Sequence, residues 1–146
     1  MDFNYEEYEE KCNEIRAENE QLLDLFERDL QNLSPKTIRQ HLGNVDFYIN
    51  DYLLYYDALT FEHGMDKIGD FLGYFFIRKC MWSTPGTIKS TAASIKKFYG
   101  CMLNHGKIKK EDYESMCEEI KTGMPVWQAD CAQYNDPEAE NPFDFF

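Results

Sequence analysis

The sequence predicts an all-α fold: a compact bundle of four to five helices, with an extra long acidic helix at the N-terminus and an acidic C-terminal extension. Three observations predict this fold. Apolar residues recur at three- and four-residue steps through most of the chain, and no pair of alternating segments indicates a β-hairpin. The helix start "SPKTIR" at 34–39 also returns as "TPGTIK" at 84–89. At 146 residues the chain is long enough for one domain with its own core.

Residues 5–31 predict the long N-terminal helix. Asn19 takes the one polar position in an otherwise apolar stripe, and it would set the register if two copies of this helix paired. Packing on the same chain is favoured instead, because further leucines widen the stripe beyond a coiled-coil seam. The stripe consists of Tyr8, Cys12, Ile15, Leu22 and Phe26, and the widening leucines are Leu23, Leu30 and Leu33.

Each copy of the repeat opens a helix. A hydroxyl residue, Ser34 or Thr84, precedes a proline, and this pair is a strong helix start. The first copy predicts a helix over 35–56 and the second a helix over 86–103, and we expect the two to pack against each other. Their apolar stripes are Ile38, Leu42, Val45, Ile49, Tyr52 and Tyr56 in the first, and Ile88, Ala92, Ile95, Tyr99 and Met102 in the second.

Two further helices are predicted over 64–80 and 110–122. After Gly123 we expect one more short helix that packs Trp127, followed by a Pro-rich acidic tail that is partly mobile. The predicted apolar positions are Ile68, Phe71, Leu72, Phe75 and Phe76 in the first of these helices, and Tyr113, Met116, Cys117 and Ile120 in the second.

The charges divide the chain into three parts. The overall net charge is −12, but residues 1–33 carry −8, residues 34–110 carry +5 and residues 111–146 carry −9. We therefore expect an acidic N-terminal helix, a basic helical domain, and a C-terminal helix with an acidic tail. The basic part contains both copies of the repeat, which makes it the candidate for a nucleic-acid partner.

The two helix starts carry features of a phosphate site. Thr37 and Thr87 stand where a capping box would place Glu or Gln, and cations surround both starts although the helix dipole disfavours them there. A bound phosphate would resolve this, since helix N-termini bind anions. Ordinary capping beside a solvated cationic face is the alternative interpretation. The cations are Lys36 and Arg39 in the first copy and Lys89 in the second.

The second helix also carries a face of lysines and small residues. Steps of four, three and four residues place this face beside the apolar stripe, and its small residues would let a nucleic-acid backbone come close. In the first helix Asp46 stands at the position that corresponds to Lys96, so the first face is weaker. The expected DNA-binding residues are Lys36, Thr37, Arg39, Gly43, Thr87, Lys89, Ala93, Lys96, Lys97 and Gly100.

Three segments together resemble a known family: "LSPKTIRQHLGNVDFYINDYL", "MDKIGDFLGYFF" and "STPGTIKSTAASIKKFYGCMLNHGKI". They cover about half of the chain and are similar to the N-terminal core-binding, or SAM-like, domain of tyrosine recombinases and phage integrases. The shared features are the Ser/Thr-x-x-Thr helix starts, a short acidic-apolar helix, and "FY" before a Gly-Lys-Ile turn. The resemblance implies a helical bundle that packs on one face of duplex DNA while a separate catalytic domain grips the other.

The sequence departs from that family in its chemistry. The catalytic domain would supply an H-x-x-R motif, and none of His41, His63 and His105 is followed by the required arginine. We find no nucleotide-binding or hydrolase motif and no metal-ligand spacing, so we expect no enzyme activity, no cofactor, no metal and no small-molecule ligand. The five cysteines are expected to be buried free thiols.

Two classes of function stay open. The first is a non-catalytic DNA-binding module that works with a recombinase catalytic subunit. The second is a helical protein-interaction module whose acidic ends dock on a basic partner. The longest apolar run, "FLGYFFI", is too short to span a bilayer and the acidic start is unlike a signal peptide, so we expect a cytoplasmic protein without membrane contact.

Overall fold

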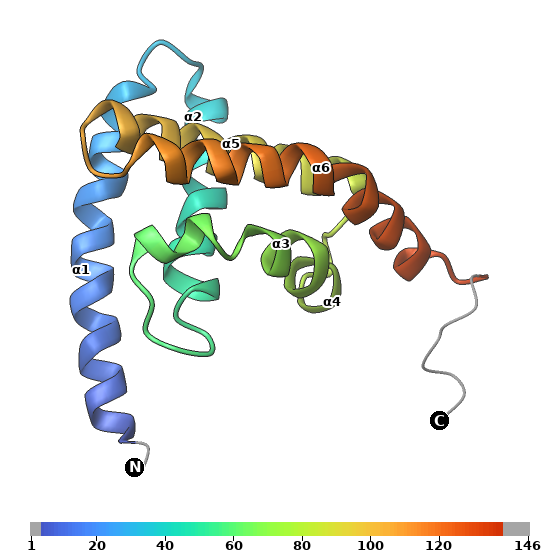
Figure 1. Cartoon of the computed structure of the whole chain (residues 1–146), viewed down its shortest axis with the longest axis horizontal. Coiled ribbons are helices and arrows are strands. Elements are labelled where there is room, and N and C mark those ends of the chain that lie inside the picture. The colour runs from blue at the N-terminus through green and yellow to red at the C-terminus, as the bar shows by residue number, and fades with distance from the viewer. Residues whose placement is uncertain (1–3, 139–146) are drawn as a thin grey trace.

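The computed structural model describes residues 4–138 and is all-helical, which confirms the predicted fold class. Two long antiparallel helix pairs cross each other (Figure 1). The first pair is α1 (Tyr5–Asp29) with α2 (Pro35–Asp46), and the second is α5 (Pro85–Asn104) with α6 (Lys110–Asn135). The last residues of the predicted acidic tail, 139–146, lie outside the described part of the chain.

Shorter helical segments connect the two pairs. Helix α2 continues directly into a π-helical segment, η1 (Phe47–Tyr52), and a 3₁₀ turn follows at η2 (Phe61–Met65). The next three segments form one unbroken helical run and place all five predicted apolar positions of the 64–80 helix in the core. They are α3 (Ile68–Asp70), the π-helical η3 (Phe71–Phe75) and α4 (Phe76–Lys79).

Helix α1 packs on its own chain, as the widened stripe predicts. The residues that it buries are the predicted ones from Cys12 to Phe26, with Asn19 among them. The Asn19 side chain donates hydrogen bonds to the Ile49 carbonyl (3.2 Å) and to Asn50 Oδ1 (2.8 Å). The polar position in the stripe is therefore satisfied inside the chain, where a buried unpaired amide would be costly.

The predicted end of the first repeat helix is wrong. The helix ends near Tyr52, and Tyr56 is 66% exposed instead of lying in the apolar stripe. A π-helical turn holds more residues than an α-helical one. Pairs of adjacent residues therefore point toward the core in this segment, and the apolar residues no longer recur at three- and four-residue steps. The pairs buried here are Tyr48 with Ile49, and Tyr52 with Leu53.

The predicted end of the last helix is also wrong. Helix α6 continues past Gly123 and Pro125 as far as Asn135, so no separate short helix packs Trp127. A proline inside a helix removes one backbone hydrogen bond. Here the second half of the helix buries Trp127 and Cys131 in the core, and this burial offsets the loss.

One core joins all three charge segments. Phe26 and Leu30 from α1, and Met116, Ile120 and Trp127 from α6, belong to the same cluster of buried residues as the middle of the chain. The thiols of Cys12, Cys80, Cys101 and Cys131 are buried, as expected, and that of Cys117 is half-buried.

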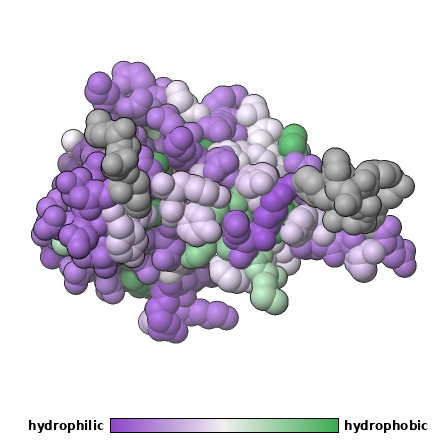
Figure 2. Space-filling view, turned by 90° about the horizontal axis from the view of Figure 1, so that it is seen from below, coloured by the Kyte–Doolittle hydropathy of each residue, from purple (hydrophilic) through white to green (hydrophobic). Residues whose placement is uncertain are grey.

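Within residues 4–138 no helix combines the length and apolarity that crossing a membrane requires. Figure 2 shows one face, on which hydrophobic residues reach the surface in a limited central region. The exposed large apolar and aromatic side chains are Tyr5, Tyr55, Tyr56, Tyr74, Met81, Trp82, Val126 and Tyr134.

Candidate nucleic-acid interface

Helix α5 presents the predicted lysines on one side, which we name the α5 lysine face. The opposite side of the helix fixes this orientation, because Ile88, Ala92, Ile95, Tyr99 and Met102 are all buried in the core as predicted. The α5 lysine face consists of Lys89, Ala93, Lys96 and Lys97, which are exposed, and Gly100, which is half-buried.

The C-terminal half of the α5 lysine face lines a groove of about 590 Å³. The other walls come from the end of α1, from His41 of α2 and from Tyr113 of α6. A β-carbon at Gly100 would lie 3.3 Å from the Tyr113 hydroxyl, so the glycine lets the start of α6 approach α5 closely. The lining residues are Phe26, Asp29, Leu30, His41, Ala93, Lys96, Lys97, Gly100, Cys101, Asn104 and Tyr113.

The lysines of this face carry charges that the protein does not neutralise. Across residues 4–138, no carboxylate lies within 4.0 Å of the amino group of Lys89, Lys96 or Lys97. The contacts of this kind in that part of the chain join His105 to Asp29 and Lys110 to Glu114. The lysines therefore stay available to an external anion although acidic residues outnumber basic ones by 27 to 15.

His41 brings a titratable group to the same groove. Its Nδ1 lies 2.8 Å from the hydroxyl of Ser94, which is buried and donates its own proton to the Ser90 carbonyl (3.1 Å). Nδ1 of His41 must therefore be the donor in the first contact, and Nε2 of the neutral ring is an acceptor. Burial, followed by the nearby charge of Lys97, lowers the pKa of His41.

The second helix start is a complete capping box built from threonines. Thr84 Oγ1 accepts from the Thr87 N–H (3.0 Å), and Thr87 Oγ1 accepts from the Thr84 N–H (2.7 Å). Thr87 thus fills the position at which Glu or Gln is usual. Its hydroxyl also reaches the Trp82 carbonyl (3.0 Å), so it is fully engaged within the cap.

The first helix start is capped in a similar way. The Thr37 N–H donates to Ser34 Oγ (3.3 Å), and the Ser34 hydroxyl donates to Thr37 Oγ1 (2.9 Å). Both repeated starts therefore have the geometry of ordinary helix capping. Their threonine hydroxyls are held by the chain, and the lysines are the groups that point away from it.

The structure does not bring the two helix starts together. Helix α2 begins just after α1 ends, whereas α5 begins beside the C-terminal part of α6 (Figure 1). Two side chains of α6 hold the second start: Gln128 Nε2 donates to the Pro85 carbonyl (2.9 Å), and Asn135 Nδ2 donates to the Ser83 carbonyl (2.6 Å).

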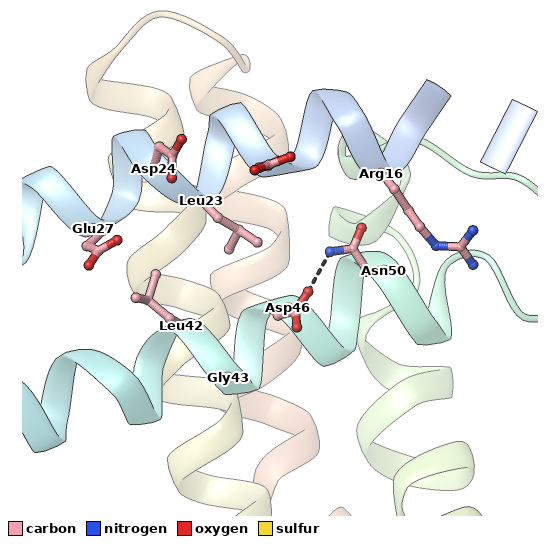
Figure 3. A pocket seen from close by; sticks show the side chains of 9 residues that line it. Arg16, Leu23, Asp24, Glu27, Leu42, Gly43, Asp46 and Asn50 are labelled. Atoms are coloured by element: carbon pink, nitrogen blue, oxygen red, sulfur yellow. Dashed lines mark hydrogen bonds between the residues drawn. The ribbon is translucent and has the colours of Figure 1, made fainter. Parts of the chain in front are cut away.

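Gly43 lies on a different groove from the lysines. This second groove, of about 460 Å³, runs between α1 and α2, and four carboxylates surround it (Figure 3). It repels phosphate, so Gly43 is poorly placed for a DNA contact. Lys36 and Arg39 are exposed on α2 and do not line the groove of the α5 lysine face. The lining residues are Arg16, Glu20, Leu23, Asp24, Glu27, Leu42, Gly43, Asp46 and Asn50, and we name this the acidic groove.

Sequence reasoning missed a polar cluster at the edge of the first groove. Asp29 at the end of α1 contacts both Cys101 Sγ (2.9 Å) and His105 Nε2 (2.9 Å) of α5. These two hydrogen bonds lower the pKa of Asp29, while burial and the bond to Asp29 raise the pKa of Cys101 to about 12. The spacing of Cys101 and His105, four residues apart on one helix, was the available signal.

No model of a known protein family matches this chain, and neither a curated protein nor a solved structure matches it. The resemblance to recombinase core-binding domains therefore depends on the quoted sequence features and stays a prediction.

Proposed function

We propose that this protein is a non-catalytic DNA-binding module that contacts duplex phosphates through the α5 lysine face. The observation that carries the proposal is the set of three unpaired lysines, Lys89, Lys96 and Lys97, on one side of one helix in a strongly acidic chain. Their amino groups lie on one side of α5, so the three charges act together on an anion that approaches that side.

The shape of the groove supports the same role. Ala93 and Gly100 alternate with the lysines, so the ridge of the helix is low where a sugar-phosphate backbone would lie. His41 adds a second polar group at the wall opposite α5. A phosphate near Lys97 would raise the pKa of His41, so that its imidazole could gain a proton and donate to the anion.

The acidic helices limit the strength of this binding. Most of the carboxylates lie on α1 and α6, and they repel DNA from those two helices. Contacts to phosphates alone give weak, sequence-independent binding, roughly 10⁻⁴ to 10⁻⁶ M at physiological salt. A module of this strength would act beside a partner such as a recombinase catalytic subunit, in line with the family resemblance.

The acidic groove supports the second candidate function, a protein-interaction module. Glu20, Asp24, Glu27 and Asp46 surround a floor that includes Leu23 and Leu42. This combination suits an amphipathic segment with basic side chains. The lysine face and the acidic groove lie on different elements, so variants of each can be tested separately.

Fluorescence anisotropy of a labelled DNA duplex, titrated with the full chain at low salt, tests the first function. The double variant Lys89→Glu/Lys96→Glu should lose binding. The matched control, Lys67→Glu/Lys121→Glu, makes the same change in net charge at two exposed lysines away from the groove. An equal loss in both variants, or no salt-sensitive binding by the natural chain, would exclude the proposed interface.

A further inference from the structure

Three different metal-binding groups converge where α1 and α5 end. They are the carboxylate of Asp29, the thiol of Cys101 and the imidazole of His105, and one ligand atom from each lies within 4.8 Å of the others. Both Cys101 Sγ and His105 Nε2 are 2.9 Å from the same oxygen, Oδ2 of Asp29. Cys101 is buried, whereas Asp29 and His105 are exposed, so an ion could enter from solvent.

Local backbone structure fixes the positions of these groups. Cys101 and His105 are four residues apart and therefore lie on the same side of α5. The helix then ends in a Schellman motif, in which the Lys107 N–H donates to the Met102 carbonyl (2.9 Å) and Gly106 has a φ of +71°. On the other side, Leu30 is buried directly after Asp29 and anchors the end of α1.

The two helix ends at this place favour a cation, although Lys96 and Lys97 line the adjoining groove. The C-terminal end of a helix carries a partial negative charge, and here the ends of α1 and α5 meet. Asp29 adds a full negative charge at the end of α1, where the helix dipole disfavours it. A positive ion between the two ends would be stabilised by both helices and by the carboxylate.

We propose that Asp29, Cys101 and His105 bind a divalent transition metal, with zinc as the best fit. Three protein ligands of mixed oxygen, sulfur and nitrogen type, with a water as fourth ligand, are typical of zinc, whereas calcium and magnesium take oxygen ligands. Neighbouring ligands of a tetrahedral zinc ion lie roughly 3.3–3.6 Å apart, with sulfur at the long end of this range. The two 2.9 Å contacts would therefore open by about 0.4–0.7 Å.

When a metal binds, bonds to the ion replace the hydrogen bonds of the cluster, and the displaced protons go to solvent. The Cys101 thiol loses its proton to solvent as the metal–sulfur bond forms. The proton that His105 Nε2 donates to Asp29 also leaves to solvent, and the neutral ring that binds the metal through Nε2 carries its proton on Nδ1. The ion would then tie the end of α1 to the end of α5. Because Asp29 and Cys101 also line the groove of the α5 lysine face, it would add positive charge at the edge of that groove.

Titration of the reduced, metal-free full chain with Co²⁺ tests the site. We expect a sulfur-to-cobalt charge-transfer band and d–d bands of a four-coordinate ion, saturating at one equivalent and disappearing on addition of Zn²⁺. Cys101→Ser should remove the charge-transfer band. His105→Gln should weaken cobalt binding by more than about 100-fold. Losing a residue that only hydrogen-bonds to a metal ligand costs roughly 10- to 100-fold in metal affinity, and His105 is proposed as a ligand itself.

Matched variants keep the test specific. Cys117→Ser removes a half-buried thiol outside the cluster, and His63→Gln removes another exposed imidazole. Both variants should leave the spectrum unchanged. Cys101→Ser retains a hydroxyl that can donate to Asp29, so the fold is kept. Cobalt binding without a charge-transfer band would indicate adventitious carboxylate binding and would overturn the proposal, as would a band that survives in Cys101→Ser.

Discussion

The indole of Trp127 lies directly against the backbone of Gly73. A β-carbon built on Gly73 would come within 2.7 Å of Cδ1 of Trp127, which is closer than side-chain carbons approach. Helix α6 and the helical run from α3 to α4 therefore meet at a glycine. Gly123, one turn before the tryptophan, makes room for the same ring, since its β-carbon would lie 2.2 Å from Cζ2.

Gly73→Ala should destabilise the protein, although alanine is the better helix former. The added methyl group overpacks against a rigid ring, at a cost of about 1–3 kcal/mol. Gly43→Ala is the matched control, because no atom lies within 4 Å of its added carbon, and it should gain up to about 1 kcal/mol from helix propensity. Urea unfolding measures both free energies, and shifts of the same sign would contradict the contact.

This contact also explains where the sequence misled. Gly123 and Pro125 have the composition of a helix end, and only the distant residue Gly73 reveals why α6 continues past them. The end of the first repeat helix was missed because π-helical turns leave no periodic signal. Where the helices are regular, as in α1 and α5, the apolar steps predicted the buried residues correctly.

The same distinction applies to the candidate sites. The α5 lysine face was predictable because its members lie on one helix and share one side. Gly43 looked equivalent by repeat position, but the neighbouring helix α1 surrounds it with carboxylates. The spacing of Cys101 and His105 indicates one half of the Asp29–Cys101–His105 cluster, but Asp29 lies more than 70 positions away and no local pattern joins it to them.

Ile95→Ala should cost on the order of 2–5 kcal/mol in the free energy of unfolding. Ile95 is completely buried in the middle of α5, and its truncation leaves a cavity where the helix meets the core. Ile38→Ala, at a half-buried position of α2, should cost less. A change at Ile95 below about 0.5 kcal/mol would contradict its place in the core.

Because of His41, the free energy of unfolding should decrease as the pH is lowered below neutrality. Its pKa is lowered in the fold, so the unfolded chain binds the proton first as the pH drops below the ordinary value of about 6.5. The contribution of His41 to the free energy of unfolding is thus complete above that pH. It is lost as the pH falls through the pKa that His41 has in the folded protein. Urea unfolding at about pH 7.5 and about pH 5.5, where carboxylates stay ionised, should show a smaller fall for His41→Gln than for the natural chain. His63→Gln is the control, and an equal fall in all three proteins would exclude this role.

Thr87→Val should lower stability and leave DNA affinity unchanged. The hydroxyl of Thr87 completes the capping box of α5, and loss of such a cap costs about 1 kcal/mol. Calorimetry measures the stability, and anisotropy measures the affinity at a temperature where both proteins are folded. A several-fold loss of affinity in the folded variant would restore the phosphate-anchor interpretation of the helix starts.

Under the proposed function, the salt dependence of DNA binding counts the phosphates that the α5 lysine face contacts. Three lysines predict a slope of log K against log salt of about −3, since each contact contributes about −0.9. Replacing Lys89 and Lys96 by alanine removes two contacts and should bring the slope to about −1, without the added repulsion of a charge reversal.

Neutralising the acidic groove with Asp24→Asn/Glu27→Gln should raise DNA affinity through weaker repulsion and leave the slope near −3, because these residues contact no phosphate. A steeper slope for the groove variant would mean that the DNA lies in the acidic groove and not on α5. An unchanged slope in the lysine variant would place the phosphate contacts elsewhere.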